Sequence, residues 1–412
     1  MSFLDFTQRF SHTSDYGKSM LWFVKLLMEG ALMWPDTKRP KLLIASTIII
    51  SFSGIFTWFG ILFYILNIND FNKAIYGTCL LALPTMNILK TPLIGYKYKA
   101  IKKLLNQIEA DFWPYDIVDM ETKQEMKYIN SLTVGFMLFF YILAQIYYGA
   151  FLILPAFLTE RALPLPCILP FGWTDKLSYA FIYVLQFICL QFGVAFAVVG
   201  IDILTLSLCL CTSNQYRILR KCFLIYNTDD MIQINDRLRT TSKVSMKQYV
   251  LEKEYLIRLI KHHNLLLRYT RYMNEVLNPF ELGHLVISIM GICLGAFVLS
   301  MSDISTFDRI LATIYLFGFI LQLAIDCIVG TDLHYQATLL PDYVFHSDWK
   351  LLNDNHLKKD ILFVLQTSQR YPQFTAYNLY ELNMSTFLKI QKLAFSVYTL
   401  LSNMSKITSK ET

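Results

Sequence analysis

The longest apolar stretch of the chain, residues 178–212, reads SYAFIYVLQFICLQFGVAFAVVGIDILTLSLCLCT and contains one formally charged residue, Asp202. About 20 consecutive apolar residues suffice for a helix to cross the hydrocarbon core of a bilayer. The stretch shows no alternation of apolar and polar residues, and an isolated strand cannot satisfy its backbone hydrogen bonds in lipid. It therefore predicts a membrane-spanning helix.

Six further stretches have the same character, and 55% of the chain is hydrophobic. The seven predicted spans are about 42–66, 74–94, 132–157, 178–212, 283–302, 309–330 and 385–404. The second and the last are the weakest, because Lys90, Lys389 and Lys392 lie inside them. We predict an all-α fold: one polytopic membrane domain over residues 1–412, with seven transmembrane helices and a cytosolic anchor from about 213–282 and 331–384.

Residues 18–34 form a shorter apolar segment in which Lys18, Lys25 and Glu29 recur at steps of seven and four. A helix with this spacing has one polar stripe, which favours a helix lying in the membrane interface over an eighth span. The first forty residues lack the apolar core and cleavage site of a signal peptide.

The basic residues predict the orientation of the bundle. The N-terminal tail and the segments after spans two, four and six, with Lys90, hold 29 of the 37 Lys and Arg residues, whereas the opposite side holds six. Basic loops stay in the cytosol. The N-terminus is therefore expected inside and the C-terminus outside, and the net charge of +6 reflects this bias rather than nucleic-acid binding.

Aromatic residues with polar groups gather in the outer halves of spans two, three, four and six. An apolar cavity with a few hydroxyl groups suits a small neutral ligand, although tyrosines near an interface also serve as membrane anchors. The candidate ligand-binding residues, with two neighbouring leucines, are Tyr76, Leu80, Tyr147, Tyr148, Phe151, Tyr183, Phe187, Leu311 and Tyr315.

The last predicted span carries two stripes. Lys392, Ser396, Thr399 and Asn403 share one helix face, and a neighbouring face is apolar. This pattern fits a helix that lines a pore, with apolar residues as a dewetting gate, but it also fits ordinary helix packing. The candidate pore and gate residues are Ser396, Leu400, Asn403 and Met404.

Asp202, His284, Asp326 and Lys90 lie in the inner portions of their spans. Charged side chains within the bilayer tend to mark ion or proton paths. The outer halves of the spans lack such charges, which argues against a proton-coupled carrier that works at the midplane. The sequence shows no cysteine spacing typical of a zinc site and no carboxylate pair or nucleophile motif typical of an enzyme. We therefore expect no enzymatic activity, no cofactor and no metal site.

Three C-terminal stretches resemble the insect odorant receptor family. They are LIRLIKHHNLLLRYTRYMNEVLNPFELGHLV (256–286), GTDLHYQATLLPDYVFHSDWKLL (330–352) and QTSQRYPQFTAYNLYELNMSTFLKIQKLAFSVYTLLSNM (366–404). The last looks like the closing signature of the family, with Phe395, Ser396, Tyr398, Leu400 and Leu401. The resemblance covers residues 256–404 well and the rest by the pattern of spans.

The resemblance implies a ligand-gated, non-selective cation channel in the plasma membrane of a sensory dendrite. It implies a heteromeric tetramer with co-receptor subunits, an odorant pocket in the outer half of spans two to six that includes Tyr315, and a gate at Leu400 and Met404. The segment between spans four and five, 213–282, is shorter than in the co-receptor, so the chain looks like a ligand-specific subunit.

Three alternatives stay open at this point. Seven spans also suit a G-protein-coupled receptor, but the predicted orientation is opposite to that class and its Asp-Arg-Tyr and Asn-Pro-x-x-Tyr motifs are absent. A small-molecule transporter is disfavoured by the lack of midplane charges. A gustatory receptor would end in a Thr-Tyr…Gln-Phe signature, which the last span lacks.

Overall fold

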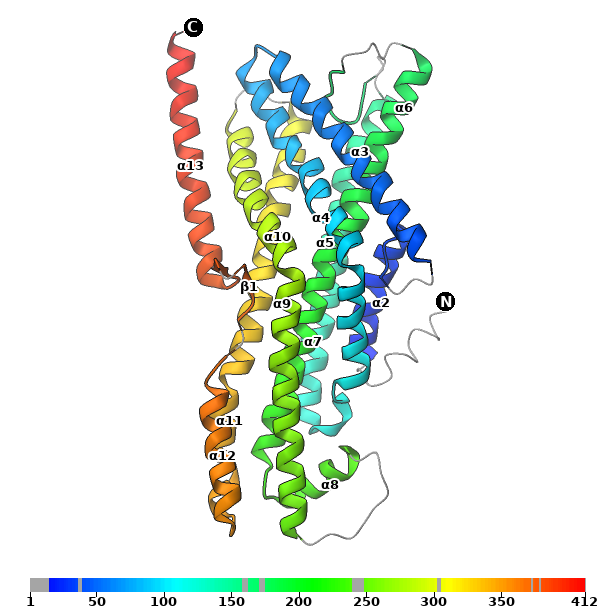
Figure 1. Ribbon diagram of the computed structural model, residues 1–412. Coiled ribbons are helices and arrows are strands. Elements are labelled where there is room, and N and C mark those ends of the chain that lie inside the picture. The colour runs from blue at the N-terminus through cyan, green and yellow to red at the C-terminus, as the bar shows by residue number, and fades with distance from the viewer. Residues whose placement is uncertain are drawn as a thin grey trace.

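The computed structural model describes residues 15–35, 39–157, 162–169, 175–238, 248–301, 305–371, 373–377 and 379–411. Long helices stand side by side in a tall bundle, and a hairpin of two short antiparallel strands precedes the last helix (Figure 1). The elements are α2 (Asp15–Gly30), α3 (Pro40–Asn67), α4 (Phe71–Asp111), η1 (Tyr115–Ile117), α5 (Met120–Phe157), α6 (Lys176–Phe187), η2 (Ile188–Val198), α7 (Val199–Leu224), α8 (Asp229–Leu238), α9 (Gln248–Ser300), α10 (Thr306–Thr338), α11 (Leu340–His346), η3 (Asp348–Leu351), α12 (Asn355–Ser368), β1 (Thr375–Ala376), β2 (Tyr380–Glu381) and α13 (Met384–Glu411).

The predicted all-α membrane class is confirmed. Six of the seven predicted spans fall within helical residues, and the fifth, 283–302, is helical up to the end of α9 at Ser300. Five helical segments of the described chain are long and apolar enough to cross a bilayer: α3, α5, the continuous run from α6 to α7, α9 and α10. The other two, α4 and α13, contain the lysines that also weakened their prediction from sequence. Helices α4, α5, α7, α9 and α10 continue well beyond their predicted spans, and so form a second, non-spanning half of the bundle.

Asn87 of α4 marks the place where α3, α4 and η2 meet. Its amide nitrogen donates to the Ile50 carbonyl at 3.2 Å, and its amide oxygen accepts from the Thr91 hydroxyl at 2.7 Å. A Cβ atom at Gly193 would lie 2.4 Å from this amide nitrogen, so only glycine allows η2 to approach so closely. The 11 residues of η2 form a π-helix, and such segments are frequent at functional sites.

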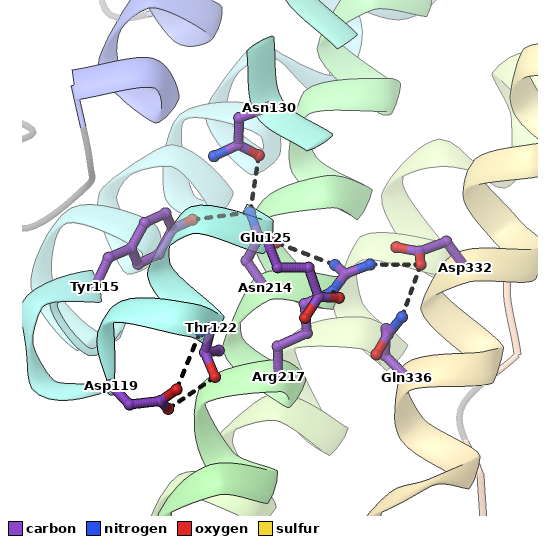
Figure 2. A network of polar contacts seen from close by, with 9 residues as sticks. All are labelled: Tyr115, Asp119, Thr122, Glu125, Asn130, Asn214, Arg217, Asp332 and Gln336. Carbon is purple, nitrogen blue, oxygen red and sulfur yellow. Dashed lines mark hydrogen bonds and ion pairs between the residues drawn. The ribbon is translucent and has the colours of Figure 1, made fainter. Parts of the chain in front are cut away.

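Helix α7 is the centre of the second half of the bundle, with nearly all of its residues buried. Arg217 of α7 is 2% exposed and forms an ion pair with Asp332 of α10, at 2.7 Å between Nη2 and Oδ1. Figure 2 shows this guanidinium between helices, close to Glu125 of α5 as well as to Asp332, with Asn214 one turn before it on α7. The network ties α5, α7 and α10 together below the spans.

Helix α2 covers the side of the bundle formed by α5, η2 and α7. Its apolar residues Met20, Leu21, Val24 and Leu27 are buried, whereas Trp22 and Leu26 are exposed. Of the predicted polar stripe, Lys25 is buried and pairs with the exposed Glu29 at 3.5 Å, and the Lys18 side chain lies outside the described part of the structure. The broad apolar face of α2 therefore packs against protein.

Residues 162–169 form an irregular segment held at the end of the bundle by Gln186 of α6. The amide of Gln186 accepts from the Leu165 N–H at 2.9 Å and donates to the Leu165 carbonyl at 3.2 Å. The Ile168 N–H donates to the Gly60 carbonyl of α3 at 3.1 Å. Residues 158–161 and 170–174 of the same loop lie outside the described part of the structure.

Helix α13 stands at the edge of the bundle, beside α9 and α10 (Figure 1). The chain reaches it through the hairpin, in which Thr375 pairs with Glu381 and Ala376 with Tyr380. Ile390 and Ala394 face the bundle and are buried, whereas Phe395 and Leu400 are exposed. One long face of α13 is therefore uncovered in the isolated chain.

Candidate ligand-binding site

A cavity of about 60 Å³ lies within the bundle, between α4, α5, η2, α7 and α10. Aromatic, aliphatic and methionine side chains make up most of its wall, and three tyrosine side chains and one glutamine bring polar groups to it. Its lining residues are Leu83, Met86, Phe140, Leu143, Ala144, Tyr147, Tyr148, Val194, Val198, Val199, Ile314, Tyr315, Gly318, Phe319 and Gln322.

Three of the nine candidate ligand-binding residues line this cavity: Tyr147, Tyr148 and Tyr315. Tyr147 and Tyr315 contact each other across it, with ring centroids 6.1 Å apart. Phe319 lies one turn further along α10, with its ring tilted against that of Tyr315 and the two centroids 4.7 Å apart. An aromatic wall from two helices is thus already assembled around the space.

Four more candidates pack in the same outer apolar cluster without lining the cavity: Tyr76, Leu80, Phe151 and Leu311. The Phe151 ring lies 5.2 Å from that of Tyr147, measured between centroids. Tyr76 donates to Asp308 at 3.4 Å, near the end of the bundle where α3 leads into α4. These residues therefore pack around the aromatic residues that line the cavity.

The structure does not bring Tyr183 and Phe187 of α6 to the cavity. The Tyr183 hydroxyl donates to the Leu152 carbonyl of α5 at 2.6 Å, and the Phe187 side chain is 37% exposed. Both lie on the correct helical run, but the cavity is lined further along that run, by Val194, Val198 and Val199.

Sequence reasoning missed most of the lining, although helical spacing contained a signal for it. Residues three, four and seven positions before Tyr147 on α5 are Ala144, Leu143 and Phe140, and all three line the cavity. The same steps after Tyr315 on α10 lead to Gly318, Phe319 and Gln322. Counting helical steps of three, four and seven from each tyrosine would have predicted both walls of the cavity.

The tyrosine hydroxyl groups in the cavity wall differ in their hydrogen-bond partners. Tyr315 donates to the Cys79 carbonyl of α4 at 2.9 Å and so joins α10 to α4. The Tyr147 and Tyr148 hydroxyls have no hydrogen-bond partner among the residues that the structure describes. These two phenols are therefore available to a ligand that carries an acceptor.

Gln322 forms the polar end of the cavity. Its side-chain amide donates to Asp202 of α7, and Asp202 forms an ion pair with Lys90 of α4. Lys90 and Asp202 are 1% and 8% exposed, so their charges are compensated inside the bundle. Sequence analysis placed both residues at similar depth, and the structure pairs them.

The candidate pore residues all lie on α13, away from the cavity. The Ser396 hydroxyl donates to the Lys392 carbonyl at 3.0 Å, and the Leu400 side chain is 60% exposed. Asn403 and Met404 belong to the same helix, but their side chains lie outside the described part of the structure. Their role as a gate stays a prediction.

A family model described as 7tm Odorant receptor matches residues 70–395, which is most of the chain. The chain belongs to the 7tm odorant receptor family. The resemblance inferred from the three C-terminal stretches is therefore confirmed. As a member of this family, the chain is a multi-pass membrane receptor and not an enzyme.

Several odorant receptors of Drosophila melanogaster are similar to this family member. Odorant receptor 98a is 30% identical over 154 residues, which cover 36% of this chain and 37% of that protein. Odorant receptor 94a is 25% identical over 323 residues, which cover 74% of this chain and 70% of that protein. Odorant receptor 13a is 24% identical over 162 residues and is matched over 39% of its length. Two of these three relatives are thus matched over less than half of their length.

Solved structures show the same fold. The insect olfactory receptor OR5 from Machilis hrabei in complex with eugenol superposes with a TM-score of 0.76, at 13% identity, over 95% of this chain and 100% of that chain. The structure of OR5 without a named ligand gives a TM-score of 0.74 at 14% identity, over 94% and 99% of the two chains. The odorant receptor fold therefore extends over nearly all of this receptor.

Proposed function

We propose that this receptor is a ligand-specific subunit of an odorant-gated, non-selective cation channel, which binds a small volatile apolar molecule. The observation that carries the proposal is the cavity between α4, α5, α7 and α10, with its aromatic wall and two available phenols. The chain belongs to a family of odorant receptors. One solved structure of the same fold, that of OR5, contains eugenol.

The cavity chemistry narrows the class of ligand. An apolar body would contact Leu83, Val194 and Phe319, and one hydrogen-bond acceptor would meet Tyr147 or Tyr148. Esters, ketones, aldehydes and ethers of one ring or a short chain have this chemistry. Charged volatiles are disfavoured, because Asp202 is already paired with Lys90 and Gln322.

The cavity must widen to hold such a molecule. An engineered cavity of about 150 Å³ binds benzene, whereas the space here is about 60 Å³. Met86 has a flexible unbranched side chain, and Gly318 adds no side chain to the wall. We expect ligand entry to rotate Met86 and to press against α10 at Gly318.

Helix α10 gives a physical route from the cavity to the pore. It carries Tyr315, Gly318 and Gln322 in the cavity wall, and it also packs against α13, which holds Leu400. A ligand shifts a conformational equilibrium only by its differential affinity for the two states. In this mechanism, the volatile prefers the arrangement of α10 in which the Leu400 faces of neighbouring subunits move apart.

Assembly and orientation are further parts of the proposal. The uncovered face of α13 and the family resemblance favour a tetramer with co-receptor subunits in the plasma membrane, in the dendrite of a sensory neuron. The bias of basic residues favours a cytosolic N-terminus and an extracellular C-terminus. Antibody labelling of N- and C-terminal tags on intact cells separates this orientation from that of a G-protein-coupled receptor, which is the reverse.

The decisive test is voltage-clamp recording from oocytes that express this chain with and without an insect co-receptor. A panel of neutral volatiles is applied, and surface biotinylation reports the amount of receptor at the membrane. We expect a rapid inward cation current that requires both subunits and one chemical class of volatile. Silence across the panel, with the receptor shown at the surface, would contradict the channel proposal and leave the family and the fold unchanged.

A further inference from the structure

Three side chains of metal-ligand type meet between α9 and α10, one turn beyond the polar end of the cavity. Glu281 and His284 are three residues apart on α9 and therefore share a helix face, and Asp326 reaches them from α10, four residues after Gln322. Each side chain brings one potential ligand atom to within 4.8 Å of the other two. All three are buried, with exposed fractions of 3%, 2% and 5%.

The hydrogen bonds within this cluster leave two acceptors without a donor. His284 Nδ1 lies 2.6 Å from Asp326 Oδ2. When Asp326 is ionised, Nδ1 carries the proton of this contact and Nε2 keeps its lone pair. Within the described residues, both His284 Nε2 and Glu281 Oε2 are buried and have no hydrogen-bond partner. Two acceptors without a donor in an apolar interior are satisfied either by a proton or by a metal ion bound to both.

Charge balance points to a divalent ion. The nearest ammonium group is that of Lys90, but its partner is Asp202, so this pair is neutral on its own. In their ionised forms, the carboxylates of Glu281 and Asp326 beside a neutral His284 carry two negative charges, which one divalent ion would balance. Imidazole nitrogen and carboxylate oxygen are ligands that suit Zn²⁺ and related transition metals.

We propose that Glu281 and His284 bind one divalent transition-metal ion beside α10, with Asp326 orienting the imidazole. The residues stand at the inner ends of two predicted spans. Because His284 Nδ1 contacts Asp326 Oδ2 at 2.6 Å, the ring offers Nε2 to the metal together with the Glu281 carboxylate. A carboxylate on the second ring nitrogen is the usual support of a metal-binding histidine. Water fills the remaining positions.

Chain spacing could not predict this site, because its third member lies on another helix. Metal binding would hold His284 in contact with Asp326 and so would stabilise this packing of α9 against α10 by mass action. The binding proposal stands independently of the proposed channel function, since it concerns only side chains within one chain.

The test is a metal titration of the purified full-length receptor in lipid nanodiscs, first stripped with a chelator. Co²⁺ serves as the probe, because its visible absorption reports tetrahedral nitrogen and oxygen ligation, and Zn²⁺ is then added as competitor. We expect one equivalent of Co²⁺ per chain, displacement by Zn²⁺, and a higher unfolding temperature with either ion.

Matched variants locate the ion. His284→Gln and Asp326→Asn keep size and polarity and should each weaken Co²⁺ binding by at least about tenfold, within the 10- to 100-fold range typical of altered metal sites. The control His346→Gln, at an exposed histidine of α11, should bind as the parent does. Size-exclusion chromatography checks that each variant is folded.

Two results would overturn the proposal. The parent protein could show neither Co²⁺ absorption nor a metal-dependent change in unfolding temperature, which would mean that protons alone neutralise the cluster. Alternatively, both folded variants could bind Co²⁺ as tightly as the parent, which would place the ion elsewhere in the molecule.

Discussion

Arg217 of α7 and Asp332 of α10 form an ion pair in which the guanidinium is 2% and the carboxylate 27% exposed. The pair joins residues 115 positions apart in the chain. The Arg217 Nη1 also donates to Asn214 at 3.0 Å, and Nε lies 3.5 Å from Glu125. A buried guanidinium held on three sides makes the packing of α7 against α10 depend on charge (Figure 2).

Asp332→Asn tests this dependence. Removing one partner of a buried pair costs about 3–5 kcal/mol, and partial exposure of Asp332 lowers the expected loss to about 2 kcal/mol. Thermal unfolding of the receptor in nanodiscs should show the loss as a lower midpoint. The control is Lys123→Gln at the exposed pair with Asp116, where we expect little change. An equal effect at both sites would show that burial of Arg217 is unimportant.

Gly318→Leu tests the cavity. A Cβ atom at Gly318 would meet no heavy atom within 4 Å, so an isobutyl group can enter the cavity and occupy the space of the ligand. We expect at least about a tenfold rise in the half-maximal odorant concentration, corresponding to about 1.4 kcal/mol. Gly135→Leu is the matched control, because its Cβ also meets open space but lies on the exposed face of α5. Equal responses in both variants would place the ligand elsewhere.

Tyr147→Phe and Tyr315→Phe should separate ligand binding from stability. The Tyr147 hydroxyl has no partner in the described structure, so its loss should weaken responses to acceptor-bearing volatiles by about 0.5–1.5 kcal/mol and leave unfolding unchanged. Tyr315 donates to the Cys79 carbonyl, so its loss should lower the free energy of unfolding by about 1 kcal/mol. Dose–response curves and unfolding midpoints check the two effects. A reversed pattern would remove Tyr147 from the binding site.

Acid should destabilise the half of the bundle beyond the spans. Burial, and next the neighbouring His263, lower the pKa of His262 to about 3, and burial lowers the pKa of His263 to about 4. Between these values and about pH 6.5 the unfolded chain binds more protons, so stability falls as the pH falls, by about 1.4 kcal/mol per pH unit for each histidine. Above pH 6.5 neither histidine contributes to the pH dependence.

The variant His262→Gln isolates this effect. In the parent, His262 stacks on Trp113 with centroids 3.9 Å apart and contacts Gln215 at 3.0 Å. Glutamine can keep the polar contact without titrating, so the unfolding midpoint should drop less between pH 7 and pH 5. His356→Gln, at an exposed residue of α12, should keep the slope of the parent. The same slope in both variants would mean that other groups govern the acid sensitivity.

Leu400→Asp tests the gate. A carboxylate in an apolar constriction promotes wetting, so the assembled channel should conduct without odorant or lose its gating. Leu388→Asp is the control, since Leu388 is similarly exposed but lies three turns earlier and on another face of α13. Basal current under voltage clamp, normalised to surface expression, is the measurement. Normal gating in Leu400→Asp would exclude this residue from the gate.

The helices could be predicted from the sequence because run length alone signals a span. Residues 178–212 needed no partner to be recognised, and the lysines of α4 and α13 marked the two helices whose apolar character is weakest. The site was predicted only in part, since composition reveals the depth of a side chain but not the direction that it faces. Tyr183 and Tyr148 have the same chemistry, yet only Tyr148 faces the cavity.

Contacts between helices that are distant in the chain could not be predicted from the sequence. The pairing of Lys90 with Asp202, or of His284 with Asp326, depends on which faces α4, α7, α9 and α10 turn to one another. The π-helical turns of η2 change the rotation between α6 and α7, so counting at the α-helical period from Tyr183 misplaces the faces that follow. The sequence therefore predicts the position of a residue along its own helix, but not which faces of two helices meet.

The ion pair of Lys90 with Asp202 also sets an order of events during synthesis. Helix α4 leaves the ribosome with a positive charge in its apolar stretch, and the carboxylate that neutralises it is made 112 residues later. Until α7 arrives, Lys90 lacks this partner, and a charge within a span is costly. Maturation of this receptor therefore waits on its fourth long helix, and chains truncated before residue 202 are expected to be degraded in the endoplasmic reticulum.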